Sequence, residues 1–357
     1  MTSKRRVMDA IDHKETDRVP LDLWVTKEVM GKLCAHFRTD QADDVMEELG
    51  VDIRVVEPEY IGPPLEESPE GLVKDIWGVI RRRVNYSDGN YLEVEHYPLE
   101  GDISISDMEN YPWPDPDYYD YSVIPKACEK YGDYAILNVG NRLNRTSVLK
   151  AAIYLRGMQQ LMMDMALNPP LVEILLEKIS DYYLAHNERI FKAGEGLIDI
   201  FMMGDDFGTQ KGLLISPEMF RRFFAPRLKE FAAQAKSYGL KVMLHSCGSI
   251  RELIPDIIEI GVDILNPIQA NAKGMIPEEL KEQFGDSISF HGGIDIQNTL
   301  PFGTAEDVER EVKDRIRVLG KNGGYILAST HNIQADTPVE NILAMYRTAS
   351  KVHRRKL

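Results

Sequence analysis

His245 and Cys247 stand one residue apart at the end of the apolar run KVMLHSC, residues 241–247, and His331 ends a later run at 324–331. Imidazole nitrogen and thiolate sulfur are ligands that Zn²⁺ prefers, and a catalytic zinc site commonly combines three protein ligands with one open position. Side chains two residues apart on an extended chain point to the same side, so His245 and Cys247 can reach one cation. We therefore predict that His245, Cys247 and His331 bind a metal ion. The alternative is a buried cysteine beside a hydrogen-bonded histidine.

Acidic and amide side chains stand at the ends of other apolar runs. Asp205 and Asp206 end the run 197–206, where a carboxylate can hold a substrate hydroxyl, ligate a metal or orient a metal-bound histidine. The alternative for adjacent acids is that they cap the next turn. His291 precedes two glycines, which let backbone approach a ligand closely, although a single histidine there is more typical of a residue that supports a ligand. We predict catalytic roles for Asp205, Asp206 and His291, and substrate binding by Asn138, Asn266, Gln269 and Asp295.

These residues must be positioned by the strands and helices around them. Eight short runs, most without polar alternation, resemble strands buried on both faces; they are 19–25, 51–58, 134–141, 197–206, 241–247, 263–269, 288–295 and 324–331. Helical stretches lie between them, such as 216–239 and 304–324, which begin with the good N-cap residues Ser216 and Thr304. Eight strands followed by helices predict an α/β fold, a (β/α)₈ TIM barrel with its chemistry at the carboxyl ends of the strands. A doubly wound sheet is disfavoured because no glycine-rich phosphate turn follows the first run.

One segment interrupts this alternation after the second predicted strand. Residues 73–99 alternate apolar and polar side chains around Asp88-Gly89, which predicts an inserted β-hairpin. An irregular stretch rich in tyrosine and proline follows and ends at Tyr121. We therefore expect one domain, residues 1–357, that carries an insertion at 73–121.

The composition limits the partners of the chain. With 42 basic and 57 acidic residues, the formal net charge is −15, which argues against binding to nucleic acid or to an anionic membrane. No run approaches 18 apolar residues, and the N-terminus lacks the apolar segment of a signal peptide. Three widely spaced cysteines do not make a disulfide framework and fit a reducing compartment. We expect a cytoplasmic protein; the sequence is compatible with a homodimer and does not fix the oligomeric state.

Several longer segments resemble the uroporphyrinogen decarboxylase superfamily. They are DRVPLDLW near the start, ISPEMFRRFFAPRLKEF, HSCGSIRELIPDIIEIGVDILNPIQ, FHGGIDIQNTLPFGTAEDV and GGYILASTH with TPVENILAMY. The resemblance covers nearly the whole chain and is strongest at 197–347. It implies a (β/α)₈ barrel, in agreement with the count of strands. The arginine-rich substrate motif that true uroporphyrinogen decarboxylases carry after the first strand is missing here, where the strand continues into DLWVTKEVMGKL.

The chain is more similar to the cobalamin-dependent methyltransferase branch, in which an H-x-C pair and a later cysteine hold zinc. His245 and Cys247 match the pair, and His331 stands where the later cysteine falls. Replacing a thiolate by a neutral imidazole leaves the zinc more positive and a stronger Lewis acid. The resemblance therefore implies an enzyme with Zn²⁺ that moves a methyl group from a small donor, foremost a methoxylated aromatic, to Co(I) of a separate corrinoid-binding protein.

Three other functions fit the same segments. The first is transfer from a corrinoid protein to a thiol or to tetrahydrofolate, and the second is a metal-independent decarboxylase of the same superfamily. The third is a barrel that docks a corrinoid protein without catalysis. The sequence names neither the methyl donor nor the direction of transfer nor a fourth zinc ligand.

Overall fold

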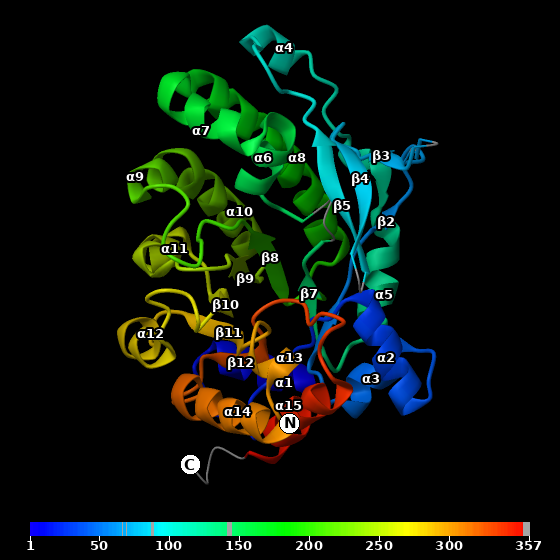
Figure 1. Ribbon diagram of the computed structural model, residues 1–357, viewed down its shortest axis with the longest axis vertical. Helices are drawn as coiled ribbons and strands as arrows, with labels where there is room; N and C mark the ends of the chain where they lie inside the picture. The colour runs from blue at the N-terminus through cyan, green and yellow to red at the C-terminus, as the bar shows by residue number, and fades with distance from the viewer. Residues whose placement is uncertain (66, 69, 87–88, 141–144, 353–357) are drawn as a thin grey trace.

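The computed structural model describes residues 1–65, 67–68, 70–86, 89–140 and 145–352. Within this part of the chain, seven parallel strands form one curled sheet in the order β1-β7-β8-β9-β10-β11-β12 (Figure 1). The strands are β1 (Ile53–Val55), β7 (Ala135–Asn138), β8 (Ile200–Gly204), β9 (Lys241–His245), β10 (Ile264–Ile268), β11 (Ser289–Ile294) and β12 (Tyr325–Ser329). Each lies inside a predicted run, and the α/β fold with a curled parallel sheet is that of TIM-like barrels.

The first predicted strand, 19–25, is irregular and contacts both edges of this sheet. Leu21 and Val25 make isolated parallel bridges to Leu327 and Ile333 on the β12 side. On the other side, the backbone N–H of Asp52, next to β1, donates to the carbonyl oxygen of Leu21 at 2.8 Å. The segment therefore lies between β12 and β1.

Helices pack around the outside of the sheet (Figure 1). They are α2 (Lys27–Phe37), α3 (Ala42–Glu48), α5 (Ile124–Lys130), α6 (Leu149–Arg156), α7 (Met158–Leu167), α8 (Pro169–Ala193), α9 (Pro217–Met219), α10 (Ala225–Ser237), α11 (Ile254–Ile260), α12 (Pro277–Phe284), α13 (Thr299–Phe302), α14 (Ala305–Leu319) and α15 (Val339–Lys351). Three 3₁₀ turns accompany them, Pro116–Tyr118, Tyr121–Val123 and Arg251–Leu253. The two predicted N-caps are confirmed: Ser216 caps α9, and Thr304 forms a capping box with Asp307 at α14.

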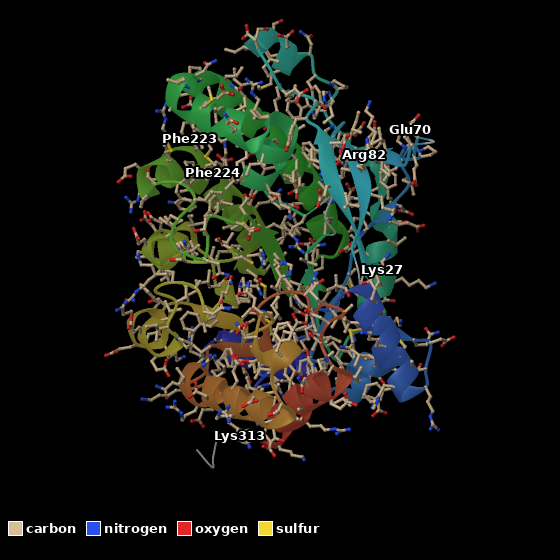
Figure 2. All side chains as sticks on the ribbon, in the orientation of Figure 1. Lys27, Glu70, Arg82, Phe223, Phe224 and Lys313 are labelled. Atoms are coloured by element: carbon tan, nitrogen blue, oxygen red, sulfur yellow. The ribbon has the colours of Figure 1, made fainter. Side chains whose placement is uncertain are left out.

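The predicted helix at 216–239 is not continuous. A π-helical turn, Phe220–Phe224, separates α9 from α10, and Phe223 and Phe224 lie in this turn (Figure 2). Pro226, in the first turn of α10, has no N–H to donate, so the regular hydrogen-bond ladder is interrupted there. Both phenylalanines are buried, so the wider turn still contributes to the core.

The N-terminal helix α1 (Ser3–Ile11) lies against one end of the sheet, in contact with β1, β7 and β12 (Figure 1). Its Val7 and Ile11 join a core cluster formed by strand side chains, among them Met202, Met243 and Ile264. The larger hydrophobic core lies between the sheet and the surrounding helices. The opposite end of the sheet, formed by the carboxyl ends of the strands, carries the polar residues of interest.

Two small antiparallel sheets lie apart from the large one (Figure 1). The segment predicted to form a hairpin contains β4 (Ile80–Tyr86) and β5 (Gly89–His96), which pair with each other, while β3 (Leu72–Lys74) pairs with β4. Asp88 of the predicted turn lies outside the described residues. The strands β2 (Glu59–Tyr60) and β6 (Tyr119–Asp120) pair separately, and α4 (Ile105–Glu109) lies beyond β5.

Charged side chains cover the outer surface. Arg82 on β4, paired with Glu95, and Lys313 on α14, paired with Glu309, are both about half exposed (Figure 2). Among the described residues, none of the helices is both long and apolar enough to cross a bilayer.

Candidate metal centre

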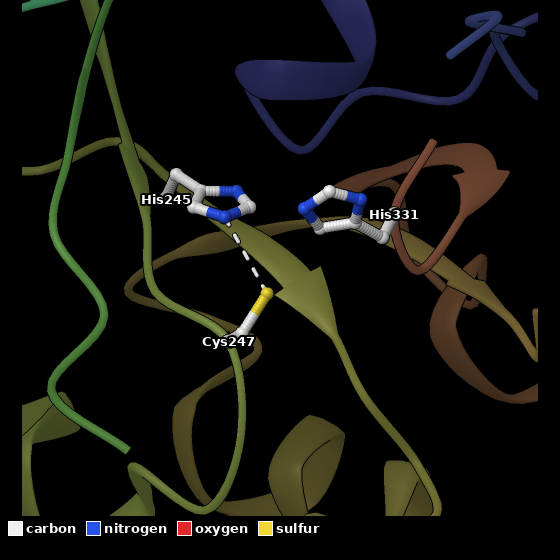
Figure 3. A group of neighbouring side chains, drawn as sticks. All are labelled: His245, Cys247 and His331. Atoms are coloured by element: carbon white, nitrogen blue, oxygen red, sulfur yellow. Dashed lines mark hydrogen bonds between the residues drawn. The ribbon is translucent and has the colours of Figure 1, made fainter. Parts of the chain in front are cut away.

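His245, Cys247 and His331 lie together at the carboxyl end of the sheet (Figure 3). His245 is the last residue of β9, Cys247 follows in the next loop, and His331 follows β12. One ligand atom from each lies within 4.8 Å of the other two, and His245 Nε2 is 3.4 Å from Cys247 Sγ. Donors this close fit around one cation whose bonds to nitrogen and sulfur are about 2.0–2.3 Å. The donor chemistry and the spacing therefore fit zinc.

Two glycines let the loop that carries Cys247 pack tightly. A Cβ on Gly208 would lie 2.6 Å from the carbonyl oxygen of Cys247, and Gly248 has a φ of +85°, a conformation that side-chain-bearing residues rarely adopt. Side chains also hold this loop: the N–H of Cys247 donates to Asp206 Oδ1 and the N–H of Gly248 donates to Gln269 Oε1, both at 2.9 Å. Asp206 and Gln269 therefore position the loop that carries Cys247.

Burial acts differently on the two ligands from this loop. Burial lowers the pKa of His245 to about 4, so its imidazole is neutral and able to donate a lone pair at neutral pH. Burial, reinforced by the negative charge of Asp206, raises the pKa of the Cys247 thiol. Metal binding requires the thiolate, so a bound cation has to compensate for that desolvation.

The second ring nitrogen of His245 belongs to a buried hydrogen-bonded chain. His245 Nδ1 lies 2.5 Å from Asn266 Oδ1, Asn266 Nδ2 lies 2.6 Å from His291 Nδ1, and His291 Nε2 lies 2.9 Å from Asp22 Oδ2. Asn266 and His291 are 1 % and 0 % exposed. Both are interior residues of β10 and β11, whereas the sequence suggested that they stand at strand ends. Asn266 therefore contacts the candidate metal ligand His245, and His291 contacts Asn266 and Asp22, so neither faces solvent.

His331 is held differently from His245. Its side chain is exposed, and the backbone N–H of Asn332 donates to its Nδ1 at 2.8 Å. A neutral ring that accepts at Nδ1 carries its proton on Nε2. His331 must therefore move that proton from Nε2 before Nε2 can bind a cation.

The adjacent acids Asp205 and Asp206 do different things. Asp205 is 1 % exposed, and its carboxylate accepts the backbone N–H groups of Val148, Leu149 and Lys150 at 2.6–2.9 Å, at the start of α6. Burial raises the pKa of Asp205 to about 7, against these three donors. These contacts make Asp205 an anchor for α6, which corresponds to the capping alternative. Asp206 is about half exposed, and its Oδ1 lies 3.5 Å from His245 Nε2, within reach of a cation there.

Two of the residues predicted to bind substrate, Asn138 and Asp295, form hydrogen bonds within the protein instead. Asn138, 3 % exposed at the end of β7, donates from Nδ2 to the carbonyl oxygen of Val56 at 3.1 Å. Asp295 accepts from the N–H of Gln297 at 2.7 Å and from Asn298 Nδ2 at 2.9 Å. Asp295 lines a separate surface cavity formed by α13 and α14, and the structure does not bring it to the three metal ligands.

Sequence reasoning missed three residues near the centre. Asp22 accepts from Trp24 Nε1 at 2.8 Å and from His291, and the Trp24 ring stacks on His245 with ring centroids 6.0 Å apart. Arg145 lies over Trp24 at 5.9 Å, and its Nε has no hydrogen-bond partner among the described residues. Asp22 and Trp24 could have been found from their alternate positions on the first predicted strand. Arg145, in a segment without periodicity, gave no signal.

A cavity of about 270 Å³ adjoins two of the three candidate ligands. Cys247 and His331 line it together with Gln269, and residues of the loop 208–210 close one side. The exposed side of the trio therefore faces a space that can admit a small molecule, whereas the buried side faces Asn266.

A family model described as uroporphyrinogen decarboxylase (URO-D) matches residues 104–352, more than half of the chain. The chain belongs to the URO-D family. This confirms the superfamily that the sequence segments suggested. The family contains enzymes of different activity, so the family alone does not give this URO-D chain its reaction.

The curated relatives of this URO-D chain include methyltransferases and decarboxylases. Methylcobamide:CoM methyltransferase MtaA from Methanosarcina barkeri is 28% identical over 175 residues, 49% of this chain and 47% of the relative. Methylated-thiol–coenzyme M methyltransferase from Methanosarcina mazei is 22% identical over 207 residues, 58% and 52% of the two chains. Uroporphyrinogen decarboxylase from Coxiella burnetii is 22% identical over 180 residues, 50% and 46% of the two chains. The chain thus spans about half the length of the curated relatives it matches.

A solved structure matches over almost the full length. A methyltransferase from Methanosarcina mazei aligns with a TM-score of 0.71 over 98% of this chain and 99% of that one, at 19% sequence identity. At this identity the likeness establishes the fold. The two curated relatives named methyltransferases support the methyltransferase branch of the superfamily that the sequence indicated.

Proposed function

We propose that this protein is a zinc-dependent methyltransferase that moves a methyl group from a methoxylated aromatic compound to Co(I) of a separate corrinoid-binding protein. The observation that carries the proposal is the convergence of His245, Cys247 and His331 at the carboxyl end of the sheet, beside a cavity. The names of two curated relatives, both methyltransferases, support the reaction type.

The ligand set favours an ether as the methyl donor. Two imidazoles and one thiolate neutralise less of the charge of a divalent cation than a set with two thiolates. A zinc ion held by this set supplies Lewis acidity toward the leaving oxygen of the donor. A thiol substrate needs this less, because it is activated by loss of a proton.

The chain's own residues bind and orient around that centre. His245 and Cys247 are fixed by the buried contacts of Asn266, Asp206 and Gln269, so the ligand geometry exists before a substrate arrives. The Trp24 ring covers one face of His245 and excludes water from it. We assign the substrate to the cavity that Cys247 and His331 line.

Arg145 is the residue we assign to a polar group of the substrate or of the corrinoid. Its guanidinium lies above Trp24, and its Nε is buried without a hydrogen-bond partner among the described residues. Leaving a buried donor of this kind without a partner costs about 1–3 kcal/mol of stability. A substrate acceptor that binds there removes this cost.

The curated names favour a second candidate function. One relative is named a methylcobamide:CoM methyltransferase and another a methylated-thiol–coenzyme M methyltransferase, and both names refer to a thiol coenzyme. The second candidate is therefore transfer of a methyl group from a corrinoid protein to a thiol, through the same metal centre. Metal-independent decarboxylation has the names of the family and of relatives such as the Coxiella burnetii protein in its favour, but it does not use the three clustered donors. Transfer to tetrahydrofolate has no observation in its favour.

Metal analysis and two assays test the proposal. We expect about one zinc per chain, demethylation of methoxyarenes with a Co(I) corrinoid protein, and loss of both in Cys247→Ala. The matched control is Cys34→Ala, since Cys34 is a free cysteine on α2, outside the centre. Turnover with a thiol acceptor alone would replace the first function by the second. Activity without zinc, or full activity of Cys247→Ala, would contradict both.

We also infer the finer architecture and setting. The contacts of 19–25 with both edges of the sheet support a complete (β/α)₈ barrel, and the core cluster that runs from Val19 to Ala349 supports one domain, 1–357, with an insertion at 73–121. The three cysteines are free, which supports a reducing, cytoplasmic location. We keep the expected absence of nucleic-acid and membrane partners, and a homodimer, as proposals.

A further inference from the structure

Two buried polar side chains link the candidate metal ligand His245 to the carboxylate of Asp22, which makes a row of four residues. The row runs from Asp22 through His291 and Asn266 to His245, with successive contacts of 2.9, 2.6 and 2.5 Å. All four are less than 5 % exposed. This row of four side chains is therefore shielded from water, and each of its polar atoms has to form a hydrogen bond with the neighbouring side chain.

The direction of each hydrogen bond follows from the amide of Asn266, whose nitrogen only donates and whose oxygen only accepts. Its Nδ2 lies 2.6 Å from His291 Nδ1, so His291 accepts at Nδ1 and carries its proton on Nε2, which faces the carboxylate of Asp22 at 2.9 Å. The amide oxygen of Asn266 lies 2.5 Å from His245 Nδ1, so His245 donates from Nδ1–H. His245 is left with its lone pair on Nε2, the nitrogen that lies 3.4 Å from Cys247 Sγ.

We propose that Asp22, acting through His291 and Asn266, sets the tautomer of His245 so that Nε2 is free to bind the metal. This deepens the proposed function and rests on its metal centre. His291 and Asn266 are then positioning residues, not contacts of the substrate. His331, whose Nδ1 accepts from the N–H of Asn332, lacks this arrangement.

Neighbouring groups hold the chain in place. The N–H of Leu23 donates to Asp22 Oδ1 and Trp24 Nε1 donates to Asp22 Oδ2, both at 2.8 Å, so both oxygens of Asp22 are engaged. The Trp24 ring lies 6.0 Å from His245 and 5.7 Å from His291 between centroids. These contacts fix the rings against rotation while the hydrogen bonds fix their protons.

A direct measurement on the wild-type chain tests the proposal without metal. Nitrogen-15 NMR of histidine-labelled, zinc-free protein distinguishes the two neutral tautomers. We expect His245 to carry its proton on Nδ1 and His291 on Nε2. The opposite tautomer at either residue would overturn the proposal, whether or not the chain proves to be a methyltransferase.

A double-mutant cycle tests the transmission between residues. In His291→Lys, a side chain with donors only replaces one that accepts from Asn266. Asn266 must then turn its oxygen toward residue 291 and its amide hydrogens toward His245, which moves the His245 proton to Nε2. We expect zinc affinity, measured by competition with a chelator, to fall about 10–100-fold. Adding Asn266→Asp restores an acceptor on both sides and should recover the affinity.

The comparison with Asn266→Asp alone decides between transmission and a simple charge effect. We expect Asn266→Asp to raise zinc affinity at least about tenfold more in the His291→Lys background than in the wild type. Equal effects in both backgrounds would overturn the proposal. His36→Lys, on an exposed part of α2, is the matched control and should leave affinity and tautomer unchanged. A wild-type chain that binds no zinc would refute the proposed function, while the NMR measurement still decides the tautomer.

Discussion

The two ends of the sheet bury polar groups in opposite ways. At the amino end, Asp52 is fully buried and accepts from Arg6 and Arg18 at 2.6 Å each and from the N–H of Leu21 at 2.9 Å. At the carboxyl end, Asn266 and His291 connect His245 to the buried carboxylate of Asp22, and the three candidate ligand atoms lie within 4.8 Å of one another. The amino end pairs its charges within the protein, whereas the carboxyl end leaves donors for something else.

This difference agrees with the general rule that the amino end of such a sheet serves stability and the carboxyl end carries the functional site. Helix α1 covers the amino end and brings Arg6 to Asp52, so these contacts stabilise the fold. The carboxyl end is left to the loops after the strands, which carry Cys247 and His331 and adjoin a cavity. Substitutions at the amino end should therefore change stability, and those at the carboxyl end should change binding and activity.

The largest expected effect is at the amino end. Asp52→Ala leaves two arginines without their shared buried partner, and removing one member of a buried ion pair costs about 3–5 kcal/mol. We expect that loss in the free energy of unfolding, measured by denaturant titration. Zinc affinity of the folded variant should equal that of the wild type. A large loss of zinc affinity would break the contrast between the two ends.

The second prediction is the opposite of the first: zinc affinity changes and stability changes little. His245→Ala removes a metal ligand and should weaken zinc binding by at least about 100-fold, roughly one ligand's share of the binding free energy. The free energy of unfolding of its zinc-free form should lie within about 2 kcal/mol of that of the zinc-free wild type. The reason is that the substitution leaves a cavity the size of only part of one side chain. Unchanged zinc affinity, measured by chelator competition, would place the metal elsewhere.

The third prediction concerns the kind of chemistry at the carboxyl end. His331→Cys supplies a second thiolate and removes the acceptor that now binds the N–H of Asn332. We expect zinc to be retained and the demethylation rate of methoxyarenes to fall about tenfold or more, because the metal becomes a weaker Lewis acid. Thiol-dependent turnover should fall less or rise. An equal change in both assays would show that the ligand set does not select the substrate.

The smallest effect is electrostatic and lies again at the amino end. The hydrogen bonds from Arg6 lower the pKa of Asp17 to about 2, from 3.8 in the unfolded chain. A carboxyl whose pKa is lowered by folding stabilises the fold above pH 4, and this stabilisation disappears as the pH falls from about 4 to 2. Because Asp17 is 44 % exposed, we expect less than about 1 kcal/mol.

Denaturant titrations of the wild type and Asp17→Asn across this pH range measure that contribution. The difference between the two should be constant above pH 5 and should vanish near pH 2. A difference that grows on acidification would contradict the assigned direction of the pKa shift.

The sequence predicted the elements that rest on local patterns. Buried parallel strands appear as apolar runs because both of their faces are covered, and β7 to β12 all lie within such runs. The break between α9 and α10 was not predicted, although Pro226 marks it. A proline in a helical pattern signals an interruption without telling whether the helix ends, bends or takes a wider turn.

The candidate site also has one part that the sequence predicted and one part that it did not. His245 and Cys247 could be paired from the sequence because their spacing on an extended chain puts both on one side. Asp22 and His291 are 269 positions apart in the sequence, and their contact depends on segments that meet only in the folded sheet. No local pattern encodes such a contact.

By itself, the sequence determined the family, the α/β alternation and the three donors proposed for the metal, since each depends on residue types and short spacings. Only the tertiary structure decided what their neighbours do. It turned Asp205 toward the N–H groups at the start of α6 and enclosed His291 and Asn266. Burial decides whether a polar atom is available, because a buried donor or acceptor must be satisfied within the protein. Burial is a property of the whole fold.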